Sequence, residues 1–120
     1  MKGNKETRKR LYKRLLELCK NHPQGFTTDK NGSLLNLKKG YAVSLTNNKQ
    51  KNISRLISQV LSFNKPLNAG FGGWLDNATN EFYLDVTQVK HTLNTALSVA
   101  KRYNQKAIFN FANLKTINVK

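Results

Sequence analysis

Apolar residues recur at helical spacing in three separate segments of the sequence, and strand and turn signals fill the stretches between them. The clearest segment has apolar residues at offsets of 0, 3, 4, 7 and 8, so one side of the helix would be apolar and the other polar. An apolar side must be covered by another element. Three such helices require a sheet with an apolar face. The residues of the clearest segment are Ile53, Leu56, Ile57, Val60 and Leu61.

The other two helices are predicted over about 5–20 and 89–100. In the first, the apolar residues fall within an arc of about 160° and basic residues fill the opposite side. Asn52 is the expected N-cap of the second helix, and Asp85 with Gln88 resembles a capping box for the third. The apolar positions are Leu11, Tyr12, Leu15, Leu16, Leu18 and Cys19 in the first helix, and Val89, Leu93, Ala96, Leu97 and Ala100 in the third.

Turn residues divide the rest of the chain into three pairs of short strands. Asn31-Gly32 favours a tight hairpin turn, because both residues tolerate a positive φ. The resulting order, α-ββ-α-ββ-α-ββ, predicts an α+β fold: a single two-layer domain of antiparallel hairpins covered by helices. Residues 1–22 would form a basic amphipathic helix packed on a core of residues 23–120. The predicted strands are 25–28, 41–45, 69–75, 81–86, 106–111 and 115–119.

The charge of the chain constrains its partners. The sequence has 21 Lys and Arg against 6 Asp and Glu, a net charge of +15, whereas small domains need a magnitude of only about 2–8 for solubility. Residues 1–20, 21–65, 66–100 and 101–120 carry +6, +6, −2 and +5. An evenly charged solvated surface would not spare one segment, so this distribution predicts a basic binding face. Its expected residues are Arg8, Lys9, Arg10, Lys13, Arg14, Lys20, Lys38, Lys39, Lys49, Lys51, Arg55, Lys101 and Arg102.

Such a face predicts nucleic acid (RNA or DNA) or a host nucleoprotein complex as the partner, and neither a membrane nor a small-molecule substrate. Sixteen lysines against five arginines favour phosphate neutralisation over base reading, so binding should weaken steeply with salt. No apolar run approaches the ~18 residues of a membrane span. With one cysteine, no internal disulfide can form. We therefore expect the cytoplasm of the host cell, with the virion as the alternative.

No catalytic constellation is visible in the sequence. Cys19, His22 and His91 are too few soft ligands for a zinc site. Asp76 and Glu81, with Asp85, are the only clustered carboxylates, and a metal-dependent nuclease would need such a cluster. Aspartates at a turn and at a helix start more often serve the backbone. The sequence therefore predicts no enzyme, no metal and no cofactor, and a nuclease is the one enzymatic alternative.

The glycine-rich and aromatic segments leave two interpretations open. Gly70-Phe71-Gly72-Gly73 lacks the Gly-Lys-Ser/Thr end of a P-loop, and instead indicates a bulge or a close backbone approach beside Trp74. The aromatic residues of the last two hairpins belong either to the core, which is their more frequent role, or to a base-stacking platform like those of sheet-based RNA binders. They are Trp74, Phe82, Tyr83, Phe109 and Phe111.

Several short segments form a pattern over residues 25–120. They are Gly25-Phe26-Thr27, Gly40-Tyr41-Ala42-Val43-Ser44, Gly72-Gly73-Trp74-Leu75-Asp76, Phe82-Tyr83-Leu84-Asp85-Val86, Ala96 with Ala100, and Asn104-Gln105-Lys106-Ala107-Ile108-Phe109-Asn110. The pattern resembles one found in small accessory proteins of phages and other mobile elements. That resemblance implies a mobile-element origin and carries no catalytic residue across.

The expected function is a non-enzymatic accessory protein that binds nucleic acid or a nucleoprotein complex. An inhibitor of a nucleic-acid-guided defence effector, of the anti-CRISPR type, belongs to this class, because occupying a channel built for phosphates requires charge and shape but no chemistry. The alternative is a structural or packaged virion protein that contacts genomic DNA.

Overall fold

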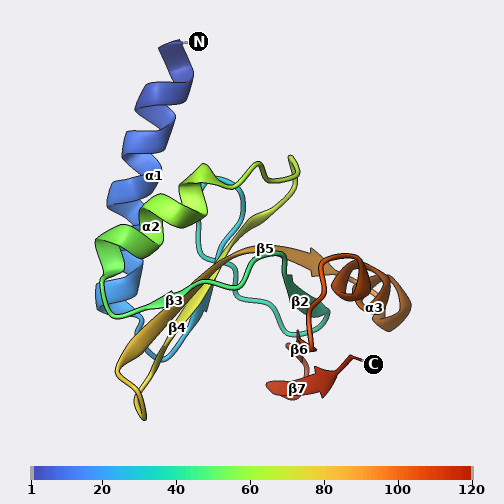
Figure 1. The fold of residues 1–120 in the computed structure, drawn as a ribbon. Helices are drawn as coiled ribbons and strands as arrows, with labels where there is room; N and C mark the ends of the chain where they lie inside the picture. Colours follow the sequence, from blue (N-terminus) through green and yellow to red (C-terminus); the bar gives the residue numbers. More distant parts are fainter. Residues whose placement is uncertain (1, 120) are drawn as a thin grey trace.

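A computed structural model describes residues 2–119, with side chains described from Glu6 onward. Within this range three helices and a seven-stranded antiparallel sheet form a mixed α/β fold (Figure 1). The helices are α1 (Lys2–Asn21), α2 (Ile53–Ser62) and α3 (Leu93–Arg102). The strands are β1 (Phe26–Thr27), β2 (Tyr41–Ser44), β3 (Lys49–Gln50), β4 (Gly70–Asp76), β5 (Glu81–Lys90), β6 (Ala107–Asn110) and β7 (Lys115–Asn118).

The long strand β5 holds the sheet together. The strand order is β1-β4-β5-β2-β6-β7, and β3 pairs with β5 off this path. Residues 81–87 of β5 pair with β4, residues 82–83 also pair with β3, and residues 87–90 pair with β2. The β4–β5 and β6–β7 hairpins therefore belong to different ends of one sheet, and Figure 1 shows them lying apart.

The two faces of the sheet differ, and alternation along β5 shows which face is covered. Phe82, Leu84 and Val86 are buried, whereas Tyr83 and Asp85 between them are only partly buried. Residues paired across antiparallel strands point to the same face, so the register extends both faces over the neighbouring strands. Phe71, Val43 and Ile108 belong to the covered face and are buried in the core.

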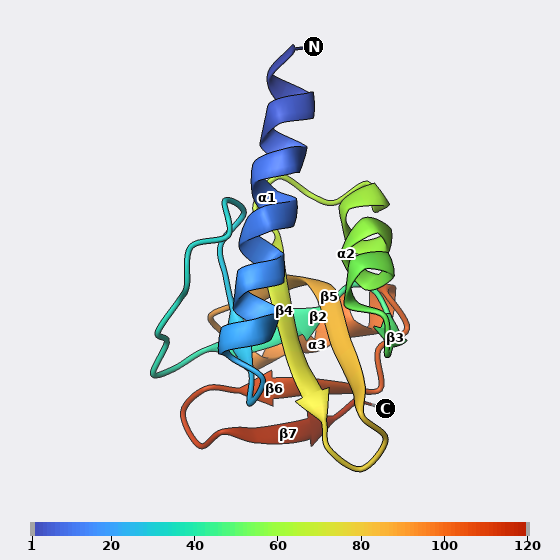
Figure 2. The same cartoon turned by 90° about the vertical axis from the view of Figure 1, so that its left-hand side faces the viewer.

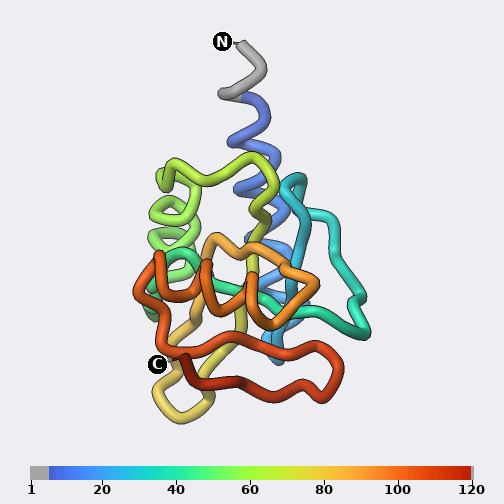
Figure 3. Tube along the Cα trace, turned by 90° about the vertical axis from the view of Figure 1, so that its right-hand side faces the viewer, coloured from blue at the N-terminus to red at the C-terminus, as the bar shows by residue number. Residues whose placement is uncertain are grey.

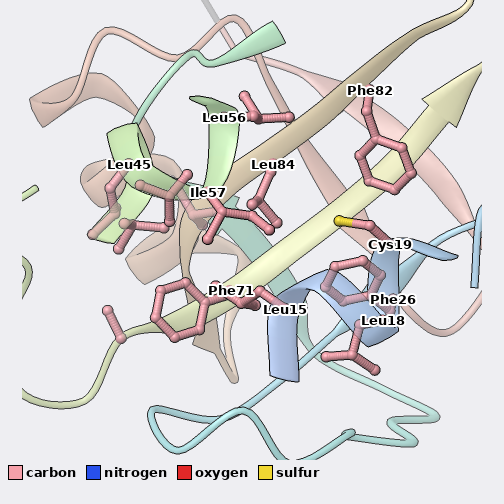
Figure 4. Close-up of a cluster of buried hydrophobic side chains, with 14 of the residues drawn as sticks. Leu15, Leu18, Cys19, Phe26, Leu45, Leu56, Ile57, Phe71, Phe82 and Leu84 are labelled. Atoms are coloured by element: carbon pink, nitrogen blue, oxygen red, sulfur yellow. The ribbon is translucent and has the colours of Figure 1, made fainter. Parts of the chain in front are cut away.

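The helices close the covered face with their apolar stripes. Figure 2 shows α1 and α2 side by side in front of β4 and β5, and Figure 3 shows α3 above the β6–β7 hairpin. Four of the six residues of the predicted apolar arc of α1 are buried, and Tyr12 and Leu16 are partly buried against the core. Cys19 lies among leucines and phenylalanines (Figure 4). The helical residues of the buried core are Leu11, Leu15, Leu18 and Cys19 in α1, Leu56, Ile57 and Val60 in α2, and Ala96 and Ala100 in α3.

Two arginines of α1 fix this helix to the rest of the chain. Arg8 donates from NH1 to the carbonyl of Leu61 at 2.8 Å. Arg14 donates from Nε to the carbonyl of Gly32 at 2.9 Å, inside the predicted Asn-Gly turn. These hydrogen bonds join α1 to α2 and to the 29–32 turn.

The structure confirms the mixed α/β class, the three helices and the antiparallel pairing. It also confirms Asn52 as an N-cap, because its side chain accepts the N–H of Arg55. The observed order has one further strand, β3, before α2. The first predicted strand pair does not form a hairpin: β1 pairs with β4, and β2 pairs with β5 and β6. These long-range partners leave the 29–32 turn with a single bridge, Thr28 to Leu34.

The predicted start of the third helix is wrong. Val89 lies in β5 rather than on the helix, and Asp85 lies in the middle of that strand instead of at a helix cap. The cap of α3 is Thr92, whose side chain accepts the N–H of Thr95. Residues 87–90 of β5 pair with β2, so sheet pairing overrides the local capping pattern.

Candidate nucleic-acid interface

The face of the sheet opposite the helices, called here the open face, is hollowed. The hollow has a volume of about 850 Å³ and extends from the β4–β5 hairpin to the β6–β7 hairpin. Small or hydroxyl-bearing residues and one carboxylate form its floor, and aromatic side chains stand at both ends. The floor includes Ala42, Ser44, Gly72, Asp85 and Thr87, and the aromatic residues are Trp74, Tyr83, Phe109 and Phe111.

One end of the hollow is a row of three side chains on neighbouring strands. Trp74 of β4 and Lys49 of β3 both stand opposite Tyr83 of β5. The rings of Trp74 and Tyr83 are stacked, with centroids 4.5 Å apart and planes 8° apart. The Nζ of Lys49 lies 5.1 Å from the centroid of the Tyr83 ring, within cation–π range. Trp74 is 46% exposed, so this row presents a large aromatic surface beside a cation.

The other end of the hollow is a second aromatic pair. Phe109 and Phe111 meet edge to face, with centroids 5.5 Å apart and planes 82° apart. Phe109 stands opposite Ala42 on one side and Thr116 on the other. Leu114, which also lines the hollow, is 71% exposed. Both ends of the open face therefore offer flat apolar surfaces.

Glycines keep the space beside Trp74 open. Gly25 lies next to Trp74, and a Cβ at Gly25 would lie 3.8 Å from the Trp74 Cβ. Gly72 stands opposite Asp85, and a Cβ at Gly72 would lie 2.9 Å from Thr87 Oγ1. On the covered face, a Cβ at Gly73 would lie 2.9 Å from the Phe26 ring. A Cβ at Gly70 would overlap the backbone carbonyl oxygen of Thr28, so the close backbone approach predicted for this glycine-rich run is present in the structure.

Asp85 brings a carboxylate to the floor of the hollow. Its Oδ1 accepts two hydrogen bonds, from Thr46 Oγ1 at 3.0 Å and from the Asn48 N–H at 2.9 Å. Burial raises the pKa of Asp85 from 3.8 to about 6, although both hydrogen bonds act in the opposite direction. The sequence predicted a helix cap at this position and missed its place on the open face.

This raised pKa predicts a pH-dependent stability. The folded protein holds the Asp85 proton more tightly than the unfolded chain does, so the resulting stabilisation is complete below about pH 4 and disappears as the pH rises through about 6. Asp85→Asn keeps an oxygen for Thr46 and Asn48 but does not titrate. The urea midpoints of the two proteins are to be compared from pH 4 to 7. Between pH 4 and 6 the midpoint of the wild-type protein should decrease relative to that of Asp85→Asn, and above pH 6 the difference should stay constant. If the midpoints of the two proteins change in parallel with pH, the pKa of Asp85 is not raised in the folded protein.

The structure distributes the thirteen predicted basic residues over several regions. Six belong to α1, and α1 lies at the opposite end of the sheet from α3, which carries Lys101 and Arg102 (Figure 1). Lys49 lies over the ring of Tyr83, which lines the hollow. The exposed Lys38 and Lys39 directly follow Leu37, which also lines it. All are exposed except Arg14, which is partly buried; Arg8 and Arg14 hold α1 in place, as described above. The remaining members are Lys9, Arg10, Lys13 and Lys20 on α1, and Lys51 and Arg55 around the start of α2.

The acidic, cysteine and histidine side chains that were candidates for metal binding or catalysis lie apart, and several make structural contacts. Asp76 accepts the N–H of Ala78 in the β4–β5 turn, and Glu81 lies 3.5 Å from Lys49 Nζ. Burial raises the pKa of the Cys19 thiol to about 12, and His91 is exposed. Among the residues that the structure describes, no three His, Cys, Asp or Glu side chains gather closely enough to hold a metal ion. In the same part of the chain, no helix combines the length and apolar character needed to cross a membrane.

Of the five aromatic residues considered for a stacking platform, Phe82 belongs to the core and the other four line the hollow. The alternation of Phe82, Leu84 and Val86 with Tyr83 and Asp85 is the sequence signal that separates the two groups. Comparisons with protein-family models, with curated proteins and with solved structures gave no match.

Proposed function

We propose that the protein is a non-enzymatic binding protein for single-stranded nucleic acid, and that the open face is where the strand binds. The observation that carries this proposal is the stack of Trp74 on Tyr83, which is exposed on a sheet face and lies beside Lys49. Proteins that bind single strands combine aromatic side chains on which bases stack with cations that follow the phosphates. The open face combines both groups.

The shape of the site favours single strands over duplexes. Bases in a duplex are stacked on one another, and a sheet surface reaches them only when they are unstacked. The aromatic residues of the open face lie in and around a hollow rather than on a projecting helix or ribbon that could enter a groove. A single strand of either RNA or DNA therefore fits the site.

The only tryptophan of the chain provides a direct test, because Trp74 lies within the proposed site. Single-stranded RNA and DNA oligonucleotides of about ten nucleotides should quench the fluorescence of Trp74, and the quenching should reach a plateau as the site fills. The matched control is a hairpin duplex of the same composition, which should quench weakly. Absence of quenching by single strands, with no binding by a labelled oligonucleotide, would refute the proposal.

The lysines beside the hollow predict the salt dependence of binding. Each phosphate neutralised on a single strand contributes about 0.7 to the slope of log K against log salt. Contacts from Lys38, Lys39 and Lys49 would therefore give a slope of about −2, and Lys49→Gln should make it shallower by about 0.7. The control is Lys90→Gln, because Lys90 stands opposite Tyr41 on the covered side of the sheet. A slope near zero for the wild-type protein would contradict the phosphate contacts.

A second candidate function rests on α1. This helix presents Lys9, Lys13 and Lys20 to solvent on the side away from its buried arc, and such a surface fits a channel that normally holds phosphates. It favours an inhibitor of a nucleic-acid-guided defence effector, of the anti-CRISPR type. If α1 is the inhibitory surface, changing these three lysines to glutamate should abolish inhibition, whereas Trp74→Ala should still inhibit. The opposite pattern would assign inhibition to the open face.

A further inference from the structure

The carboxylate in the floor of the hollow points to the kind of base that the site selects. We propose that the hollow is a guanine-reading subsite, in which Asp85 Oδ2 accepts the N–H groups of the base while the ring contacts Trp74. This inference rests on the proposed function and adds a base preference to it. Its three elements are a free carboxylate oxygen, an uncovered aromatic face and a gap between them.

The free oxygen follows from the hydrogen bonds of Asp85. Both bonds described above end on Oδ1, and none among the described residues ends on Oδ2. Every buried polar side-chain atom in that part of the chain has a hydrogen-bond partner. Because Oδ2 has none, it is not buried, and it is open to the hollow that Asp85 lines. An ionised carboxylate oxygen only accepts hydrogen bonds. Its two free lone pairs therefore select a ligand edge with N–H donors.

The uncovered aromatic face belongs to Trp74. Tyr83 covers one face of the indole ring, and on the other side the neighbouring strand position is Gly25, which has no side chain. Gly72 precedes Trp74 by two residues and stands opposite Asp85, so the space above Gly72 borders both side chains. Successive residues on one face of a strand are about 6.6 Å apart, and a purine above Gly72 can therefore contact Trp74 with its ring and reach Asp85, on the adjacent strand, with its N–H edge.

Among the bases, guanine matches an acceptor-only partner best. Its N1–H and N2–H₂ donors are adjacent, so both can point at one carboxylate oxygen. Adenine and cytosine place a ring nitrogen acceptor beside their amino group, and uracil and thymine place carbonyls on both sides of a single N–H. The negative charge of Asp85 also repels phosphates, which directs the base into the hollow and the backbone toward Lys49 and the exposed lysines of the 38–39 loop.

The test uses the full chain and single strands that differ at one central base. Guanine should bind about tenfold more tightly than inosine, which lacks the N2 amino group, because a hydrogen bond to a charged acceptor is lost. Adenine and uracil should bind at least as weakly as inosine. In Asp85→Asn, guanine and inosine should bind equally. Thermal unfolding of the variant checks its folding, and 7-deazaguanine, which keeps both donors, should bind like guanine.

The outcomes separate this inference from the function on which it rests. Equal binding of all bases by the wild-type protein, or an unchanged guanine preference in folded Asp85→Asn, overturns the guanine subsite and leaves single-strand binding intact. Absence of binding by every oligonucleotide overturns both. Guanosine monophosphate tests whether the site binds the base of a free nucleotide or only a base within a strand. If it binds as tightly as the strand, guanine reading is supported and strand binding is overturned.

Discussion

Replacing Trp74 by alanine is expected to weaken binding of single-stranded nucleic acid by roughly 5- to 150-fold. The reason is that stacking of a base on an aromatic side chain contributes about 1–3 kcal/mol by alanine substitution, and each 1.4 kcal/mol is about tenfold in Kd. Trp74 is 46% exposed and packs on Tyr83 rather than in the core, so the fold should persist. Fluorescence anisotropy of a labelled oligonucleotide measures the change without depending on tryptophan emission.

Two further variants make this result specific. Trp74→Phe keeps a ring on the open face and should retain most of the affinity. Leu93→Ala removes another exposed apolar side chain, 40% exposed, from α3 on the other side of the sheet, and should leave Kd unchanged. If Leu93→Ala weakens binding as much as Trp74→Ala, exposed apolar surface rather than stacking is responsible.

Replacing Gly70 by alanine is expected to destabilise the fold by about 3 kcal/mol or more, a large part of the roughly 5–15 kcal/mol that stabilises a small domain. A Cβ at this position would overlap the backbone carbonyl oxygen of Thr28. The backbone cannot easily move away. The Thr28 N–H donates to the Phe71 carbonyl at 2.7 Å, and the Phe71 N–H donates to Thr28 Oγ1 at 3.2 Å.

Urea unfolding followed by circular dichroism measures the loss in Gly70→Ala. Leu67→Ala, in the segment just before β4, serves as the control, because Leu67 is 89% exposed and exposed substitutions usually change stability by less than about 0.5 kcal/mol. A midpoint for Gly70→Ala equal to that of Leu67→Ala would mean that the backbone at Thr28 does not approach Gly70 this closely.

Local sequence patterns predict much of this fold. The stripe of α2 and the arc of α1 pack into or against the core as their spacing indicates, because helical periodicity is a property of one continuous segment. Strand partners are different, since they depend on residues far apart in the chain. Nothing near Phe26 indicates that it stands opposite Gly73, and nothing near Asp85 distinguishes a helix cap from a strand position until the pairing of β5 with β2 is known.

The open face was only partly predictable for the same reason. Trp74 and Tyr83 could be identified as candidates for stacking, but their contact requires the β4–β5 register. Phe109 and Phe111 join the same hollow only because β6 pairs with β2. The charge of the chain predicted a basic surface but not its division, because the separation of α1 from α3 follows from their places at opposite ends of the sheet (Figure 1).

The buried position of Cys19 has a practical consequence for measuring this protein in action. Alkylating reagents are attacked by thiolates rather than by thiols, and a thiol with a pKa of about 12 inside the core is almost entirely protonated and shielded from them. The native chain should therefore resist maleimide labelling, so a cysteine introduced at Asn77, in the exposed turn of the β4–β5 hairpin, would carry a dye at that position alone. Energy transfer from such a dye to a labelled strand would report the direction in which the strand crosses the hollow.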